Sequence, residues 1–187
     1  MQTPSRSTAK YSDQLIRPTA DRAREALFNI IGREVANATV LDLYAGTGAL
    51  GLEALSRSAE LAVFVDNSPQ AIKIIKKNID LCGFSDRTIV LKRDLAKGLT
   101  FVSKKLPGLG FSIVFVDPPY RKGLSEAMLQ ELAESAILLP EALVIIEEKA
   151  LTELPSQVAE LCRVDHRRYS ETGFWFYRQK KFLQDSA

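Results

Sequence analysis

The stretch VDPPYR, residues 116–121, holds the residues of this chain that are best suited to chemistry. The carboxylate of Asp117 and the carbonyl of Pro118 are both hydrogen-bond acceptors, and the proline rings keep the backbone that carries them rigid. The exocyclic amine of a nucleobase is a poor nucleophile because its lone pair is delocalised into the ring. Two acceptors that take both amine protons would stabilise the charged, pyramidal nitrogen of a transition state. These residues therefore predict group transfer to such an amine.

Pro119 and Tyr120 complete this candidate catalytic stretch. Pro119 restricts the turn, and the Tyr120 ring offers a face on which a base can stack, an interaction worth about 1–3 kcal/mol per base. Asp117 could also accept the proton that the amine loses. In-line transfer of a methyl group from a sulfonium depends on alignment and electrostatics, so we predict no metal and no covalent nucleophile. A plain Asp-Pro-Pro turn with a surface tyrosine is the structural alternative.

A glycine-rich loop, LDLYAGTGALG, lies upstream of this stretch. Gly46, Gly48 and Gly51 form a G-x-G-x-x-G pattern between an apolar run and a helical stretch, and Asp66 follows 20 residues after Gly46. The glycines would let the backbone approach a ligand closely, and the acid would accept hydrogen bonds from ribose hydroxyls. The pattern fits a nicotinamide dinucleotide and S-adenosylmethionine equally well, because both present an adenosine ribose. A tightly packed helix start without a ligand is the alternative.

Three aspartates, Asp42, Asp66 and Asp94, lie at or just after the ends of apolar runs. If these runs are parallel strands of one open sheet, the three carboxylates line the same crevice. A row of carboxylates suits a cationic sulfonium better than a pyrophosphate, although backbone N–H groups could still hold phosphates and each aspartate could serve only as a cap. We predict the following cofactor-binding residues: Asp42, Tyr44, Ala45, Gly46, Gly48, Asp66, Asn67, Asp94 and Leu95.

The elements that would position these residues alternate along the chain. Near-continuous apolar runs predict strands that are covered on both faces, and they lie at 39–44, 61–66, 88–92, 111–117 and 142–148. Helical spacing is found between them, at 49–57, 69–82, 94–104 and 124–138. Two further runs, CRVDHRRY and GFWFYRQ, are separated only by SET and Gly173 and predict an antiparallel hairpin. The sequence therefore predicts a Rossmann-like α/β fold, with a mostly parallel seven-stranded sheet that ends in an antiparallel hairpin.

The chain length of 187 residues fits one domain. We expect a polar lead over 1–16, a single domain over 17–182 and a short tail over 183–187. RPTADRAREALFNIIG predicts the first helix, with Thr19 as its N-cap and Gly32 at its end. Two cysteines and one histidine cannot supply a structural zinc site, and such sparse thiols indicate a reduced, cytoplasmic chain. No apolar run is long enough to span a bilayer. We expect a monomer.

Charge is distributed unevenly along the chain. Residues 1–24 hold five basic and two acidic side chains, and residues 163–181 hold six and two. Residues 25–162 hold 14 basic and 18 acidic side chains. Solvated surfaces would account for both basic ends, but the same charges are suited to a polyanion such as a nucleic acid.

Three segments together resemble a known family. LIRPTADRAREALFNIIG, LDLYAGTGALGLEALSR and VFVDPPYRKG are similar to the bacterial 16S ribosomal RNA guanine-N2 methyltransferase family (RsmD-type), over a range from about Leu15 to Tyr177. The resemblance implies a class I S-adenosylmethionine-dependent methyltransferase fold. It also implies methyl transfer to the exocyclic amine of one guanine in 16S rRNA, within an assembly intermediate of the small subunit. The chain departs from the family at its start, where only sixteen residues precede Arg17 in place of a basic, glycine-containing stretch.

The resemblance also implies roles for individual residues. Gly46 and Gly48 would approach the cofactor, Asp66 would bind its ribose and Asp94 its adenine, while residues 117–120 would hold the guanine. We further predict that basic residues beside the first helix and after the catalytic stretch contact RNA, with solvated charge as the alternative: Arg17, Arg22, Arg24, Arg121 and Lys122.

Two other functions remain open at this point. A nicotinamide-dependent oxidoreductase would explain the glycine loop, but it leaves DPPY and both basic ends unexplained. A non-catalytic RNA-binding assembly factor could keep the same fold, although an intact Asp117 and an intact glycine loop count against it.

Overall fold

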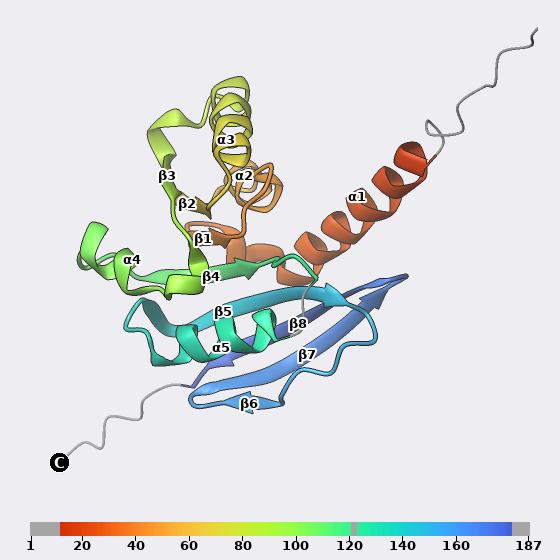
Figure 1. The fold of residues 1–187 in the computed structure, drawn as a ribbon, viewed down its shortest axis with the longest axis vertical. Coiled ribbons are helices and arrows are strands. Elements are labelled where there is room, and N and C mark those ends of the chain that lie inside the picture. Colours follow the sequence, from red (N-terminus) through yellow and green to blue (C-terminus); the bar gives the residue numbers. More distant parts are fainter. Residues whose placement is uncertain (1–11, 121–122, 181–187) are drawn as a thin grey trace, which may run out of the picture.

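The computed structural model describes residues 12–120 and 123–180, which form an eight-stranded sheet with helices on both faces (Figure 1). The strand order is β3-β2-β1-β4-β5-β8-β7-β6. The first five strands in this order are parallel neighbours, and the last three continue the sheet in antiparallel pairs. The strands are β1 (Thr39–Leu43), β2 (Leu61–Asp66), β3 (Thr88–Lys92), β4 (Phe111–Val116), β5 (Leu138–Lys149), β6 (Gln157–Val158), β7 (Leu161–Tyr169) and β8 (Thr172–Gln179).

Helices and short 3-10 turns connect these strands. Within the described ranges, none of the helices is long and apolar enough to cross a membrane. The helices are α1 (Ser12–Ile31), α2 (Ala49–Ser56), α3 (Pro69–Cys82), α4 (Thr100–Lys105) and α5 (Leu124–Glu134), and the turns are η2 (Gly32–Val35), η3 (Ser85–Arg87) and η4 (Leu95–Lys97).

The sheet carries a separate apolar core on each face, because successive side chains of a strand point to opposite sides. Phe64 of β2 packs in one core with residues of α1, α2 and α3. Its neighbours Val63 and Val65 pack in the other core with residues of α4 and α5. The hairpin takes part in both cores, since Phe174 of β8 belongs to the first and Trp175 to the second.

The strand order reverses at β1, which lies between β2 and β4. The chain crosses by α2 and α3 on one face after β1 and β2, and it crosses by α4 on the other face after β3. Such a reversal opens a crevice at the carboxyl ends of the strands. There the backbone N–H of Asp117 donates to the Leu43 oxygen at 3.4 Å, which joins the ends of β4 and β1.

The predicted Rossmann-like fold, with a mostly parallel sheet and an antiparallel hairpin, is confirmed. The sheet has eight strands rather than seven because the two-residue strand β6 pairs with the start of β7. The predicted helix over 94–104 divides into η4 and α4 because Gly98, with φ of 77° and ψ of −176°, interrupts it.

Two element starts differ from the prediction. α1 begins at Ser12, so Thr19 is not its N-cap and Pro18 lies within the helix. β5 begins at Leu138 rather than at residue 142. Its early start coincides with a register shift on β4 between Phe111 and Ile113, an irregularity that a sequence pattern does not reveal.

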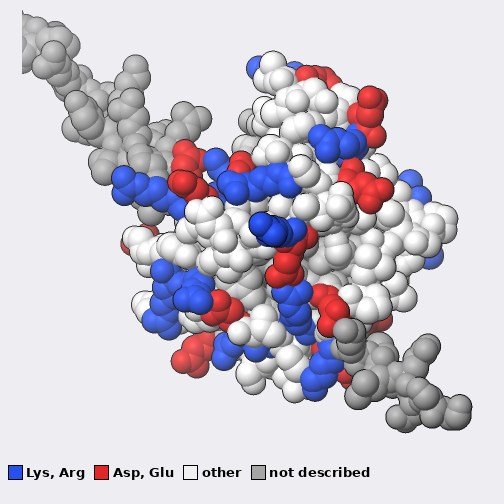
Figure 2. Space-filling model, turned by 180° about the vertical axis from the view of Figure 1, so that it is seen from behind, with Lys and Arg blue, Asp and Glu red and all other residues white. Residues whose placement is uncertain are grey.

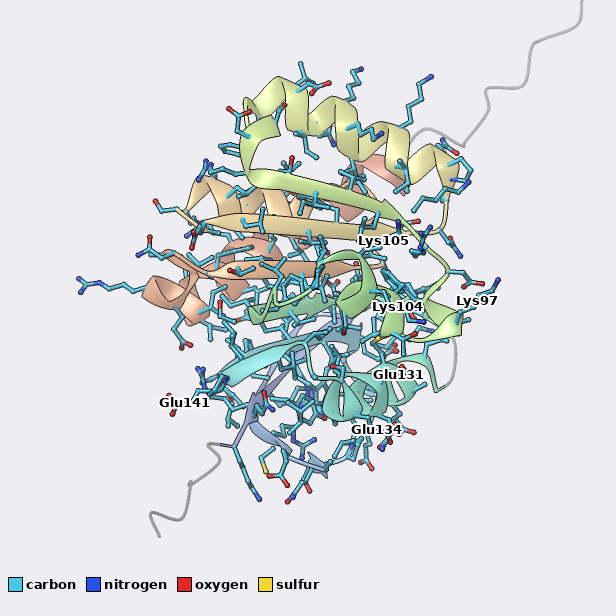
Figure 3. All side chains as sticks on the ribbon, turned by 90° about the vertical axis from the view of Figure 1, so that its left-hand side faces the viewer. Lys97, Lys104, Lys105, Glu131, Glu134 and Glu141 are labelled. Atoms are coloured by element: carbon cyan, nitrogen blue, oxygen red, sulfur yellow. The ribbon has the colours of Figure 1, made fainter. Side chains whose placement is uncertain are left out.

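The segment of η4 and α4 is attached to α5 by a side chain. The backbone N–H of Leu99 donates to a carboxylate oxygen of Glu131 at 3.2 Å. Figure 3 shows Glu131 and Glu134 on α5, with Lys97, Lys104 and Lys105 on the segment above them. This bond helps to hold the chain between β3 and β4 against α5.

Gly51, the third glycine of the loop, allows α2 to pack closely on the sheet. A Cβ at this position would lie 2.3 Å from the Phe64 ring and 3.2 Å from Asp42 Oδ2. Gly51→Ala should therefore lower the free energy of unfolding by about 1–3 kcal/mol, the usual cost of overpacking a core. Urea denaturation measures this loss. In a Phe64→Leu background the same substitution should cost less, and strictly additive costs would contradict the predicted clash.

Candidate active site

The chain turns sharply after β1, within the glycine loop. Tyr44, Gly46 and Gly48 have positive φ angles of 60°, 56° and 77°, a conformation that glycine adopts without strain. The backbone N–H of Gly48 donates to the Ala45 oxygen at 2.6 Å, and the N–H of Ala45 donates to the Val65 oxygen at 3.1 Å. The loop is therefore tied both to itself and to β2.

Asp66 orders this loop from the end of β2. Its Oδ2 accepts a hydrogen bond from the Gly46 N–H at 2.9 Å, and its Oδ1 accepts one from the Ser68 N–H at 2.8 Å. Both carboxylate oxygens are thus oriented by backbone donors. Asn67, between Asp66 and Ser68 in the sequence, is exposed.

Asp42 lies beneath the loop rather than at its surface. The residue is buried, and its Oδ2 accepts a hydrogen bond from the Gly51 N–H at 3.0 Å. Burial raises the pKa of Asp42 to about 8, with smaller contributions from the charges of Asp117 and Asp66, while the Gly51 hydrogen bond acts in the opposite direction. The carboxyl group of Asp42 therefore holds the start of α2 and contributes to the electrostatics of the crevice from below.

The residues predicted after β1 and β3 lie at the same edge of the sheet. Burial, followed by the charge of Asp94, raises the pKa of Tyr44. Asp94 is exposed and caps η4, since its Oδ1 accepts a hydrogen bond from the Ala96 N–H at 3.1 Å. Leu95 is buried in the core beside α4 and α5, so its side chain packs inward.

The DPPY stretch follows β4 directly, as predicted. Asp117 keeps contact with solvent and Pro118 is buried, whereas Pro119 is exposed. The Asp117 side chain reaches the surface, but the surrounding protein displaces much of the water around it. This burial, followed by repulsion from Glu148, raises the pKa of Asp117 to about 6. The carboxylate thus lies among other acids at the end of β4.

Two acids at the end of β5 belong to the site and were missed in the sequence. Glu148 is buried, with Ser125 Oγ donating to its Oε2 at 3.0 Å and the Lys149 N–H donating to its Oε1 at 2.9 Å. Burial, followed by the charge of Asp117, raises the pKa of Glu147 to about 8. The run VIIEEK, which ends the strand next to β4, was the signal that could have indicated them.

A cleft of about 470 Å³ opens beside Tyr120, and we call it the tyrosine cleft. Tyr120 is 51% exposed. The Thr172 side chain hydrogen-bonds with its hydroxyl, and the Lys149 ammonium lies 5.6 Å from the ring centre. The walls of the tyrosine cleft include Tyr120, Ser125, Glu148, Lys149, Thr152 and Leu154. Its position next to DPPY and its mixed lining suit a planar, polar ring.

The predicted RNA contacts are only partly described. Arg22 is exposed on α1, and Arg24 forms an ion pair with Asp21 on the same helix at 3.0 Å. The side chain of Arg17 and the residues Arg121 and Lys122 lie outside the described part of the chain. All five remain predictions. Within the described residues, no group of three or more histidine, cysteine, aspartate and glutamate side chains is placed to hold a metal ion.

The sheet order and the crevice define a Rossmann-like methyltransferase fold. An RNA methyltransferase from Salinibacter ruber, solved in complex with S-adenosyl-L-homocysteine, matches with a TM-score of 0.64 at 13% identity, covering 88% of this chain and 94% of that one. This likeness is one of fold. A conserved hypothetical protein from Streptococcus pyogenes matches with a TM-score of 0.75 at 31% identity, covering 84% of this chain and 95% of that one.

The chain belongs to the family described as Conserved hypothetical protein 95, whose model matches residues 3–178. It is 37% identical over 141 residues to ribosomal RNA small subunit methyltransferase D of Escherichia coli (strain K12), covering 75% of this chain and 68% of that protein. The protein of the same name from Haemophilus influenzae is 35% identical over 133 residues, which cover 71% and 67%. The family resemblance predicted from the three sequence segments is confirmed.

The buried Asp42 makes stability depend on pH. Its folded pKa of about 8 lies above its ordinary value of 3.8, so the folded state binds the proton more tightly and stability is lost as the pH rises from about 4 to 8. Asn can keep the acceptor for the Gly51 N–H without this ionisation. Asp42→Asn should therefore lose less stability than the wild type over that range, measured by urea unfolding at several pH values.

The exposed Asp86 on η3 provides the matched control for this measurement. Asp86→Asn should keep the pH dependence of the wild type. If the stability of Asp42→Asn declines with rising pH as steeply as that of the wild type, the ionisation of Asp42 is not the cause of the pH dependence.

Proposed function

We propose that this chain transfers a methyl group from S-adenosylmethionine to the exocyclic N2 amine of a guanine in 16S rRNA. The observation that carries the proposal is the position of Asp117 at the end of β4, at the strand-order reversal and close enough to be repelled by Glu148, which lines the tyrosine cleft. The name shared by the relatives, ribosomal RNA small subunit methyltransferase D, supports this reaction over a nicotinamide-dependent oxidoreductase and over a non-catalytic assembly factor.

The residues around the crevice fit a cationic cofactor. Burial raises the pKa values of Asp42 and Asp117, and repulsion from acidic neighbours adds to the shift. A sulfonium would relieve that repulsion. When bound, S-adenosylmethionine supplies an electrophilic methyl group and a positive charge. We propose that Asp66 binds its ribose and Asp94 its adenine, with the backbone at Gly46 and Gly48 in close approach.

The target base would occupy the tyrosine cleft. Tyr120 presents a half-exposed ring for stacking, and its hydrogen bond with Thr172 restrains that ring. The Asp117 carboxylate and the Pro118 carbonyl would accept the two amine protons and so orient the nitrogen lone pair. Asp117 then takes the proton that the nitrogen releases.

Glu147 complements Asp117 in this arrangement. Burial is the largest cause of the raised pKa of each group, with the charge of Glu148 adding to it at Asp117 and the charge of Asp117 adding to it at Glu147. Coupled carboxyl groups of this kind can share one proton, and we propose that Glu147 holds it while Asp117 is ionised. The ionised member of the pair is the one next to the tyrosine cleft, which is where an acceptor is required.

The proposed substrate also bears on where the protein acts and on its partners. We propose that the chain acts in the cytoplasm, as a monomer, on 16S rRNA or on an assembly intermediate of the small subunit.

A labelling experiment tests the reaction. Labelled S-adenosylmethionine is offered with DNA, protein, naked 16S rRNA and small ribosomal particles in turn, and the labelled nucleoside is identified. The expected product is N2-methylguanosine in rRNA. Label on adenosine, cytidine or protein would contradict the proposed acceptor.

Asp117→Asn tests the role of the carboxylate. The amide keeps the size of the side chain but loses the charge that accepts the amine protons, so kcat should fall by about 100- to 1,000-fold. The dissociation constant for S-adenosylmethionine should change much less, as calorimetry can measure. Asp86→Asn, exposed on η3, should keep the full rate. An Asp117→Asn enzyme of undiminished activity would remove Asp117 from the mechanism.

The raised pKa of Asp117 predicts the pH dependence of the reaction. Asp117 accepts protons only when it is ionised, so kcat should fall as the pH drops below about 6. Glu148→Gln removes the repelling charge and keeps an acceptor for Ser125, so the acid limb of the pH–rate profile should move to lower pH.

Asp86→Asn is the matched control for this profile. Asp86 is exposed on η3, so the loss of its charge should leave the acid limb in place. Equal shifts in both variants, or no shift in Glu148→Gln, would refute the assigned repulsion.

A further inference from the structure

A second hollow, of about 320 Å³, adjoins the tyrosine cleft, and we call it the β7 pocket. Thr152 and Leu154 line both hollows. The remaining lining consists of Glu153, three basic side chains of β7 and a tryptophan of β8: Arg163, His166, Arg168 and Trp175. A chain that enters the tyrosine cleft can therefore continue directly into a pocket rich in cationic donors.

The register of the hairpin gathers the basic side chains of the β7 pocket on one face. His166 lies opposite Trp175, Arg163 opposite Tyr177 and Arg168 opposite Gly173. Trp175 and Tyr177 point into the core beside α5, so their β7 partners lie on that side of the sheet. Arg167, opposite Phe174, lies on the other face and forms an ion pair with Asp165 at 2.8 Å.

The histidine of the β7 pocket has an unused polar atom. Its ring stacks on Trp175 with 4.2 Å between ring centres, and within the described residues its buried Nε2 has no hydrogen-bond partner. Such an orphan is unusual in a folded protein. Arg163 uses one donor on the Leu154 oxygen, at 3.0 Å, and a guanidinium has five.

The charges around His166 favour an anion. The cations Arg163 and Arg168 lie on the same face as His166, and Glu153 lines the same pocket. Asp165 is close by but lies on the other face, where it is paired with Arg167. Burial, followed by Arg168 and Arg163, lowers the pKa of His166, and Asp165 raises it only in part. Figure 2 shows basic and acidic side chains interspersed over one face of the molecule.

We infer that the β7 pocket binds a backbone phosphate of the RNA, next to the nucleotide whose base enters the tyrosine cleft. This inference rests on the proposed function. Guanidinium groups match phosphate oxygens in geometry and charge, and Arg163 and Arg168 bring two of them to this pocket. Because the two hollows share Thr152 and Leu154, one phosphate here would fix the strand that presents the target base.

Arg168→Gln tests the β7 pocket, with Arg167→Gln as its matched control on the opposite face of the same strand. Binding of a single-stranded 16S rRNA fragment is measured by fluorescence anisotropy over a range of salt concentrations. Arg168→Gln should weaken binding several-fold and reduce the slope of log K against log salt by about 0.7, as expected for one lost phosphate contact. Arg167→Gln should change the slope by less than half of that amount, and equal losses in the two variants would refute the pocket.

A spectroscopic readout separates the pocket from general charge effects. His166 is the only histidine of the chain, so its imidazole signals in NMR spectra are unambiguous. Saturating RNA fragment should raise the pKa of His166, because a phosphate beside the ring favours its charged form. The rise should be smaller in Arg168→Gln. An imidazole signal that does not respond to RNA would also overturn the inference.

The same samples distinguish this inference from the proposed function. One outcome is that the wild-type protein labels guanosine in rRNA while Arg168→Gln has the same salt slope as Arg167→Gln and the His166 signal does not respond to RNA. In that case only the inference about the β7 pocket is refuted. If RNA shifts His166 and Arg168→Gln lowers the salt slope, but no guanosine is labelled, the pocket stands and the proposed reaction fails. Thermal unfolding of both arginine variants shows whether each retains the wild-type fold.

Discussion

The burial of several carboxyl groups close together at one edge of the sheet is the constraint on which the site depends. Parallel strands end at the same edge, so Asp66, Asp94 and Asp117 come together, with Asp42 beneath them. Burial is the largest cause of the raised pKa values of Asp42 and Asp117, and acidic neighbours add to it, namely Asp117 and Asp66 at Asp42 and Glu148 at Asp117. We propose that a bound sulfonium offsets this cost.

Rigid attachments hold these charges in place despite their repulsion. Asp66 and Asp42 each accept hydrogen bonds from loop backbone, and the Asp117 N–H joins β4 to β1. The two apolar cores keep the strands below them packed. Because the site lies on strand ends rather than on a long loop, its acceptors are oriented before a substrate arrives.

The sequence predicted best those features that depend on neighbouring residues in the chain. An apolar run followed at once by an acid identified the ends of β2 and β4, and thus Asp66 and Asp117. Glu147 and Glu148 were missed because only the pairing of β4 with β5 shows that they lie beside Asp117. Similarly, strand alternation alone would put Arg163 on the same face as Arg167. The register shift on β7 between Arg163 and Asp165 moves it to the side of His166.

The distribution of charge also has a kinetic consequence. Acids surround the crevice proposed for the methyl donor, and basic side chains line the β7 pocket beyond the tyrosine cleft, so a cation and a polyanion would each be attracted to their own side. Methyl transfer removes the positive charge from the donor. Without that charge, the attraction to the carboxylates weakens and their mutual repulsion returns. The same electrostatics that favour binding of the donor therefore favour release of the spent cofactor after the reaction.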